Sequence, residues 1–308
     1  MCARSLQDGP RPIAAGPGPA GWVTWLRDYW TLTKPEVNLL VLVSTLAGFD
    51  LAWRGPMNWK LLLEALLGTL LVASGTGTLN QYLERRSDGL MRRTARRPLP
   101  SGRMNSKSAL IYGLLLALGG GWLLWNRVNP LTSILALLTL ASYLLLYTPL
   151  KRRTPWCTWV GALPGAMPPV IGWAAARGTL SAEAGALYAI LFAWQFPHLL
   201  GIAWIYREDY SRAGLRMLPG SDVEGQATVR QIMVFLLALV PLSLIPALAG
   251  ETGRFYLIGA LTLTLGFIAY GVRLVRARTN RLARQLVLAS VTYLPALLGL
   301  MMLDKGRP

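Results

Sequence analysis

Two short acidic segments hold most of the residues that could carry out chemistry in this chain. In the first, Asn80, Glu84 and Asp88 follow one another at intervals of four residues, so a helix would present all three on one face. In the second, Glu208 and Asp209 follow a long apolar stretch. Amide and carboxylate oxygens are the ligands that Mg²⁺ prefers, with water and substrate phosphate completing its shell. The alternative for the first segment is a solvated helix end whose carboxylates pair with neighbouring arginines.

Both acidic segments are also rich in arginine. Seven arginines lie between residues 85 and 103, within and after the first segment, and Arg207, Arg212 and Arg216 lie at or near the second. An arginine side chain binds phosphate oxygens through its planar fork of donors, while Mg²⁺ bridges carboxylate and phosphate. Carboxylates and arginines at the mouth of an apolar site therefore suit an amphiphile with a diphosphate head and a hydrocarbon tail.

The elements that must position these residues are membrane-spanning helices. Of the 308 residues, 53% are hydrophobic and only 15% are charged, which is below the roughly 25% charged residues typical of soluble domains. A spanning helix needs about 20 mostly apolar residues. We therefore expect an all-α polytopic membrane protein, a single bundle with a central cavity that opens to the cytoplasmic side. Nine spans are predicted, at residues 36–54, 60–82, 108–126, 130–148, 156–176, 183–206, 230–250, 254–274 and 282–303.

The segment before the first span has a different composition. Residues 1–21 are rich in Pro, Gly and Ala and contain no apolar run, so they do not form a signal peptide. They predict a disordered tail in front of one transmembrane domain, residues 22–308. Trp22, Trp25 and Trp30, interleaved with Arg27 and Asp28, predict an amphipathic segment at the membrane interface.

The basic residues predict how the chain is oriented. A net charge of +17 is compatible with nucleic-acid binding, but 24 of the 31 Lys and Arg residues fall on one side of the predicted spans. The positive-inside rule then places the N-terminus and the acidic loops in the cytoplasm and the C-terminus on the opposite side, as in a bacterial plasma (inner) membrane protein. Topology accounts for the charge, so no nucleic-acid partner is expected.

Several blocks of this sequence together resemble one family, the protohaem IX farnesyltransferase (haem O synthase) family of the UbiA-type intramembrane prenyltransferases. The similarity runs in order from about residue 31 to residue 232 and is carried by Thr33-Lys34-Pro35, Asn80-x-x-x-Glu84-x-x-x-Asp88, Met91-Arg-Arg93-Thr94-x-x-Arg97-Pro98-Leu99-Pro-x-Gly102, Tyr147-Thr148 with Lys151-Arg152-Arg153-Thr154-Pro155, Gly165-Ala-Met167-Pro168-Pro169-x-x-Gly172-Trp173, Trp194-Gln195-x-Pro197-His198, and Tyr206-Arg207-x-Asp209-Tyr210-x-x-Ala213-Gly214-x-x-Met217-Leu218-Pro219. The sequence departs from the family pattern at Glu84, where the family has Asp. The extra methylene keeps the charge but moves the oxygens.

The resemblance implies a reaction and its partners. A farnesyl group would pass from farnesyl diphosphate to a vinyl group of haem B, with addition of water, giving haem O and diphosphate for the haem A and haem O of terminal oxidases. Mg²⁺ would be the cofactor, and haem B a substrate. Membrane lipid and the downstream haem A synthase or oxidase assembly would be further partners. The alternatives are an intramembrane prenyltransferase with a quinone-precursor aromatic acceptor and a transporter.

The resemblance also implies roles for single residues. Asn80, Glu84, Asp88 and Asp209 would be catalytic and hold the metal, with Glu208 as a further ligand. The expected substrate-binding residues are Lys34, Arg93, Arg97, Lys151, Arg152, Arg153, His198, Tyr206, Arg207 and Arg212. Which basic residues meet the diphosphate and which meet the haem propionates is open at this point. His198 is either a residue of the substrate pocket, where it could ligate the haem iron, or a buried polar residue bonded across helices.

Overall fold

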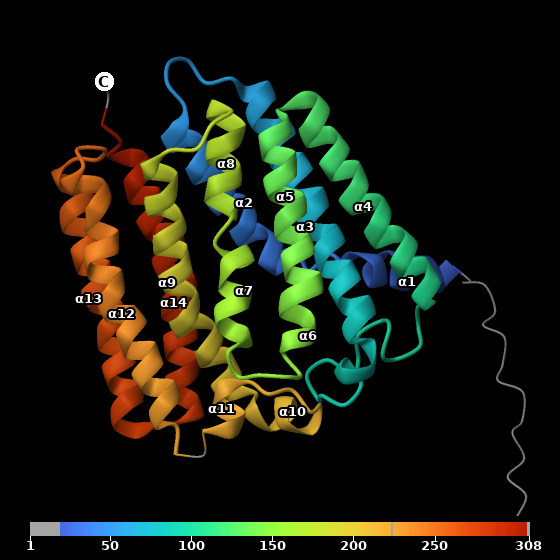
Figure 1. The fold of residues 1–308 in the computed structure, drawn as a ribbon. Helices are drawn as coiled ribbons and strands as arrows, with labels where there is room; N and C mark the ends of the chain where they lie inside the picture. The colour runs from blue at the N-terminus through green and yellow to red at the C-terminus, as the bar shows by residue number, and fades with distance from the viewer. Residues whose placement is uncertain (1–18, 223, 307–308) are drawn as a thin grey trace, which may run out of the picture.

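The computed structural model of the protein describes residues 19–222 and 224–306 (Figure 1). Within those residues there is no β-strand, only an isolated bridge between Thr252 and Lys305. Most of the predicted tail, residues 1–18, lies outside the described residues, and its last three positions belong to the first helix. The elements are, in chain order, α1 (Pro19–Leu32), α2 (Pro35–Ala52), α3 (Trp59–Asp88), α4 (Ser106–Arg127), α5 (Pro130–Ser142), the π-helical η1 (Tyr143–Tyr147), α6 (Thr148–Leu150), α7 (Cys157–Gly165), α8 (Pro168–Arg177), α9 (Ala182–Ile205), α10 (Arg207–Arg212), α11 (Leu218–Ser221), α12 (Gln226–Leu248), α13 (Arg254–Ala277) and α14 (Asn280–Leu303).

Eight helical segments among the described residues are long and apolar enough to cross a membrane. They are α2, α3, α4, the continuous run from α5 to α6, α9, α12, α13 and α14, and they confirm the all-α membrane fold. The expected span at 156–176 is instead two short helices, α7 and α8, which follow one another end to end (Figure 1). Proline lacks the N–H that a helix interior needs, and Pro164, Pro168 and Pro169 surround this break. The count of nine spans stays a prediction.

Two glycines allow α2 and α8 to pack backbone against backbone. A Cβ atom on Gly172 would lie 1.9 Å from the carbonyl oxygen of Thr45, and one on Gly48 would lie 1.9 Å from that of Pro169. No larger side chain fits at either position without moving a helix. Small residues at helix contacts are the usual device for close association in membranes, where lipid removes the hydrophobic drive between helices.

The outer faces of the bundle are apolar. Leu115 on α4, Leu145 on η1 and Leu288 on α14 are each about two thirds exposed, at 66%, 71% and 68%. A soluble protein rarely leaves large apolar side chains uncovered in such numbers, so these faces are suited to contact with lipid chains. Polar groups that could do chemistry are therefore sought in the interior and at the ends of the bundle.

Helix α1 differs from the others because it runs across them rather than along them (Figure 1). Its Trp22, Trp25 and Trp30 are exposed, which supports the predicted interfacial segment. The chain then turns sharply at Lys34, whose backbone is left-handed with φ 53° and ψ 61°. The right-handed helical conformation is disfavoured at this position because Pro35 follows. The corner ends α1 and starts the first span.

Candidate active site

A cavity of about 380 Å³ lies at the centre of the bundle, between α2, α3, α5, η1, α7, α8, α9 and α14. Its lining is mainly apolar, with the aromatic side chains of Tyr143, Tyr147 and Trp194 among it. Lys34 and His198 also line it. None of its described lining residues is an Asp or Glu. The cavity can therefore hold a hydrocarbon group and exclude bulk water from it.

The first acidic segment continues helix α3 to its end at Asp88, so Asn80, Glu84 and Asp88 occupy successive turns of one helical face as predicted. We call the end of the bundle that carries these residues the acidic end. Asn80 is almost completely buried, with 1% of its surface exposed. Its Oδ1 accepts a hydrogen bond from Lys34 Nζ at 2.7 Å, and its Nδ2 donates to Thr148 Oγ1 at 3.3 Å. Lys34 therefore connects the cavity to the acidic end.

Glu84 is bound by Lys151, which lies directly after α6. Lys151 Nζ lies 2.9 Å from Glu84 Oε1, and both side chains are only 13% to 14% exposed. The ammonium group also lies 4.5 Å above the centre of the Tyr147 ring. Burial opposes the charged form of Lys151, but Tyr147 and Glu84 outweigh it and raise the pKa of Lys151 above its usual range. Burial, with Arg97 nearby, lowers the pKa of Lys34 to about 7, so near neutral pH Lys151 is protonated and Lys34 is about half protonated.

Asp88 forms an ion pair with Arg97. Arg97 Nη1 lies 2.8 Å from Asp88 Oδ2, and the carboxylate side chain is 2% exposed. Thr94 Oγ1 donates to the backbone carbonyl of Asp88 at 2.8 Å, so the loop after α3 folds back onto the helix end. Arg152 donates to Ser87 Oγ at the same end. Arginines of two loops thus lie beside the last turn of α3.

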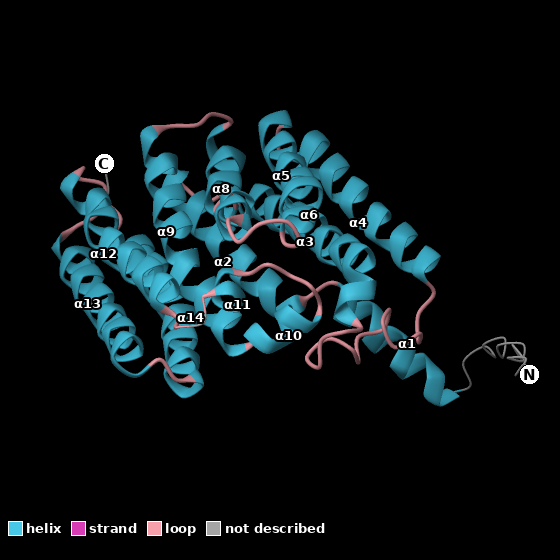
Figure 2. Cartoon of the chain, turned by 60° about the horizontal axis from the view of Figure 1, so that its bottom comes forward, coloured by secondary structure: helices cyan, strands magenta, loops and turns pink. Residues whose placement is uncertain are grey.

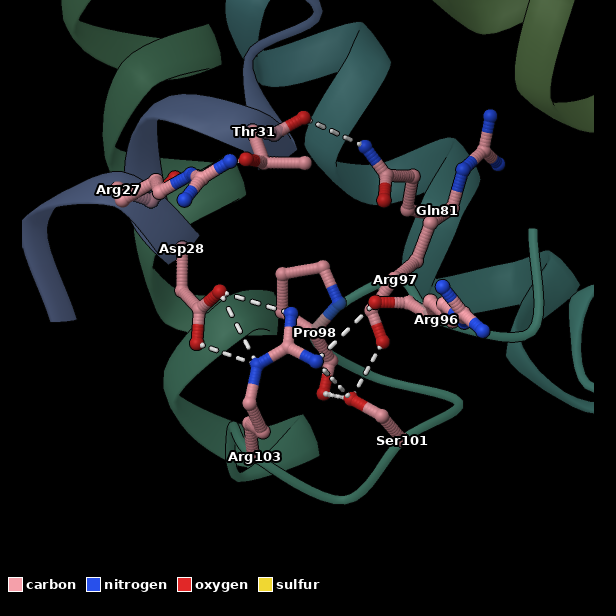
Figure 3. Close-up of polar contacts among 9 residues, drawn as sticks. All are labelled: Arg27, Asp28, Thr31, Gln81, Arg96, Arg97, Pro98, Ser101 and Arg103. Carbon is pink, nitrogen blue, oxygen red and sulfur yellow. Dashed lines mark hydrogen bonds and ion pairs between the residues drawn. The ribbon is translucent and has the colours of Figure 1, made fainter. Parts of the chain in front are cut away.

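The loop that carries Arg97 is fastened to α1 (Figure 3). Arg103 Nε and Nη2 donate to the carboxylate of Asp28 at 3.1 and 3.0 Å, and Arg103 Nη1 donates to the carbonyl of Arg96 at 3.1 Å. Gln81 Nε2 donates to the carbonyl of Thr31 at 3.1 Å and so fixes α1 on α3. These contacts hold the loop against α1, in addition to its contacts with Asp88.

The second acidic segment forms α10, which lies next to the loop that follows α3 (Figure 2). Asp209 is 7% exposed; its Oδ2 accepts the backbone N–H of Arg93 at 3.2 Å, and Oδ1 pairs with Arg212. The Arg93 guanidinium lies 4.9 Å from the centre of the Tyr206 ring. The structure therefore brings the second acidic segment onto the loop of the first, although Arg93 and Asp209 are 116 positions apart.

Among the other predicted residues, Arg207 faces another helix, and Glu208 and Arg153 are exposed to solvent. Glu208 is exposed on α10. Arg207 donates to the carbonyl of Trp204 and to Asn280 Oδ1, at 2.9 and 2.8 Å, so it faces α14. Arg153 is exposed as well. In addition, Asp222, directly after α11, accepts the backbone N–H of Thr228 at 2.7 Å near the start of α12 and so has a structural role.

The oxygen donors at the acidic end fit a metal that binds together with a phosphate. Among the described residues, no group of three or more His, Cys, Asp and Glu side chains could hold a metal ion by itself, and Glu84, Asp88 and Asp209 each have a basic partner. Mg²⁺ is commonly held by only one or two carboxylates, with water and substrate phosphate as the other ligands. The Asn80 amide adds a neutral oxygen to the same set.

From the sequence, none of Thr148, Ser87 and Asp28 was expected to take part in the site. Thr148 and Ser87 bind Asn80 and Arg152, and Asp28 anchors the loop of Arg97 through Arg103. One signal in the sequence points to Asp28, which is an acid among the tryptophans of the predicted amphipathic segment. The partners of Thr148 and Ser87 lie 68 and 65 positions away, and no local pattern identifies them.

Comparison with known proteins places this geometry in context. The model of the UbiA prenyltransferase family matches residues 41–297. A protoheme IX farnesyltransferase of Solibacter usitatus is 51% identical, over 91% of this chain and 99% of the relative. One of Koribacter versatilis is 46% identical, over 96% of this chain and 98% of the relative.

Solved structures share the fold at much lower identity. A digeranylgeranylglyceryl phosphate synthase superimposes with a TM-score of 0.74 at 16% identity, covering 91% of this chain and 98% of its own. A UbiA homologue from Archaeoglobus fulgidus bound to DMAPP and Mg²⁺ has a TM-score of 0.66 at 16% identity, covering 89% of this chain and 99% of its own. These two likenesses confirm the arrangement of the helices.

Proposed function

The chain belongs to the UbiA prenyltransferase family, and we propose that it transfers the farnesyl group of farnesyl diphosphate to a vinyl group of protohaem IX. Water adds in the same reaction, so the products are haem O and diphosphate. Relatives at 51% and 46% identity carry the name protoheme IX farnesyltransferase. The observation that carries the proposal is Lys34, which lines the apolar cavity and binds Asn80 at the acidic end. An apolar half and a polar half of one site are thereby continuous.

Basic side chains at the acidic end would receive the diphosphate. Lys34, Arg97, Lys151 and Arg152 all contact residues in the last three turns of α3. Each is bound to an oxygen of the protein, and a diphosphate offers oxygens of higher charge to the same donors. The guanidinium forks of Arg97 and Arg152 suit two phosphate oxygens at once. Charge that develops on the leaving group would be stabilised at this position.

Asn80, Glu84, Asp88 and Asp209 would hold the metal. When bound, Mg²⁺ supplies positive charge that favours departure of diphosphate. The A. fulgidus homologue, whose structure contains DMAPP and Mg²⁺, supports a divalent cation in this fold. Glu84 keeps the charge of the family's Asp on a longer side chain, and its carboxylate is already held toward Asn80 and Lys151.

The cavity would hold the hydrocarbon chain and the allylic cation that forms when the C–O bond breaks. The faces of Tyr143, Tyr147 and Trp194 carry negative electrostatic potential and can stabilise such a cation. Addition to the vinyl group leaves a second cation that water quenches, so the reaction needs no carboxylate to remove a ring proton. The absence of Asp and Glu among the described lining residues agrees with that requirement.

The orientation of the protein is part of the proposal. The excess of basic residues on one side supports a cytoplasmic acidic end in a bacterial inner membrane. Farnesyl diphosphate, a charged amphiphile, would then approach from the cytoplasm. We expect haem O to pass to the downstream haem A synthase or the oxidase assembly, and we expect residues 22–308 to form one transmembrane domain.

A single assay tests the reaction and the metal site. Membranes containing the protein are incubated with haem B, farnesyl diphosphate and Mg²⁺, and the extracted haem is analysed by mass spectrometry. Asp88→Asn should lower haem O formation roughly 100-fold or more, the usual effect of removing one transition-state stabiliser. Glu64→Gln is the matched control, a carboxylate on the same helix 24 residues away, or roughly 36 Å.

Two results would overturn the proposal. If Asp88→Asn forms haem O at the wild-type rate, the metal site is assigned wrongly. If the wild-type protein leaves haem B unchanged but prenylates a quinone-precursor aromatic acid, the acceptor is wrong while the transferase chemistry stands.

A further inference from the structure

His198 occupies a distinctive place on the wall of the cavity. It is the only histidine of the chain, it lines the cavity, and it lies on α9 seven residues before Ile205 at the helix end. Seven residues correspond to roughly 10 Å of helix, so the ring is well inside the bundle. Trp194, one turn earlier, stacks on it with ring centres 4.8 Å apart and planes 16° apart.

Ser290 on α14 fixes which imidazole nitrogen carries the proton. His198 Nδ1 and Ser290 Oγ are 2.7 Å apart, and Ser290 Oγ is also 2.6 Å from the backbone carbonyl of Val287. A serine hydroxyl has one hydrogen, and the Val287 carbonyl can only accept. Both contacts are hydrogen bonds only if the hydroxyl donates to Val287 and accepts from His198. This assignment places the proton on Nδ1 and a free lone pair on Nε2.

The surroundings hold this arrangement rigidly. Trp194 Nε1 donates to the backbone carbonyl of Ser290 at 2.8 Å, so the residue that stacks on the imidazole also binds the residue that orients it. Ser290 is fully buried. Within the described residues, His198 Nε2 has no hydrogen-bond partner, and no carboxylate lines the cavity. Nε2 is not among the fully buried side-chain atoms that lack a partner, so it is open to the cavity and to a ligand there.

We propose that His198 Nε2 is an axial ligand of the haem iron of the acceptor substrate, with Ser290 as the positioning residue. The inference deepens the proposed function and rests on it. A neutral imidazole whose second nitrogen donates to a fixed oxygen is the usual form of a metal-bound histidine. The bond uses the Nε2 lone pair, the proton stays on Nδ1, and the iron does not change its oxidation state. The tetrapyrrole would thus be held at a fixed depth, with its periphery turned toward the acidic end.

The test is the absorption and electron paramagnetic resonance spectrum of haem B bound to the purified full-length protein in lipid nanodiscs, without farnesyl diphosphate. Wild type should show a histidine-ligated iron. His198→Ala and His198→Gln should lose that signature and regain it with added imidazole. Ser290→Ala should weaken haem affinity about 10- to 100-fold. Thr292→Ala is the matched control, because Thr292 is an exposed hydroxyl two residues further along α14, and it should match wild type.

Each outcome decides the proposal. An unchanged iron spectrum in both His198 variants, or no histidine signature in wild type, overturns it. If haem O is still formed in that case, the proposed reaction stands without this ligand. If wild type shows the histidine signature but forms no haem O, the ligation stands and the proposed reaction fails. Imidazole also ligates free haem, so a folding defect is identified separately, by comparing the thermal unfolding of the haem-free variants with that of wild type.

Discussion

The ion pair between Lys151 and Glu84 gives a prediction that separates stability from catalysis. The two groups are 2.9 Å apart, and their side chains are 13% and 14% exposed. Lys151→Met and Glu84→Gln each remove one charge and leave the other buried. The double variant removes both charges and keeps the approximate shape of the site.

The size of the effect follows from the distance and the burial. At 2.9 Å and an effective dielectric constant of about 20, the attraction is on the order of 6 kcal/mol, of which desolvation offsets a large part. Removing one partner from a buried pair costs about 3–5 kcal/mol, because an uncompensated charge remains, whereas replacing both is close to neutral. We therefore expect the double variant to be more stable than either single variant by about 2 kcal/mol or more.

The assay is chaotrope-induced unfolding of the purified protein in detergent. Haem O formation is measured on the same protein preparations. The double variant should recover most of the stability and none of the activity, because Glu84 is a proposed metal ligand and Lys151 a proposed diphosphate ligand. If the two single losses simply add in the double variant, the groups do not interact and the reasoning fails. Recovered activity in the double variant would remove both residues from the proposed reaction.

Three further predictions concern packing, the loop and the metal. Gly172→Ala should destabilise the protein by about 1–3 kcal/mol, the usual cost of overpacking, because its Cβ would lie 1.9 Å from the Thr45 carbonyl oxygen; Gly119→Ala, with nothing within 4 Å, should be neutral, and equal melting of the two would contradict the packing. Asp28→Asn should cost less than about 1 kcal/mol yet speed amide exchange in residues 92–103, since the ion pair with Arg103 is lost; unchanged exchange would show that other contacts hold the loop. Excess chelator should abolish haem O formation and added Mg²⁺ restore it, and activity that survives chelation would refute the metal site.

The sequence was sufficient to predict the features that depend on local periodicity. Asn80, Glu84 and Asp88 share one face because α3 continues to Asp88, and a spacing of four residues is a property of any helix. The break between α7 and α8 was not predicted, because residues 156–176 were expected to form one span, although Pro164, Pro168 and Pro169 lie within it.

The partners of the acidic residues could not be predicted in the same way. Nothing near Glu84 selects Lys151 over Arg85 or Arg86, which are its sequence neighbours, and the contact spans 67 positions. The same holds for Asp209, which meets the backbone N–H of Arg93 rather than its side chain. These choices are made by the packing of α3, α6 and α10, which brings distant loops to one end. The tautomer of His198 likewise depends on a serine 92 positions away.

The left-handed backbone at Lys34 has a consequence for how this position can change. A non-glycine residue in that conformation costs roughly 1–2 kcal/mol, and glycine would remove the cost. Glycine would also remove the amino group that lines the cavity and binds Asn80. Stability would therefore be greater with glycine at position 34, whereas the proposed reaction requires lysine there. A more thermostable version of this protein should be sought by changing other positions, with this strained corner left intact.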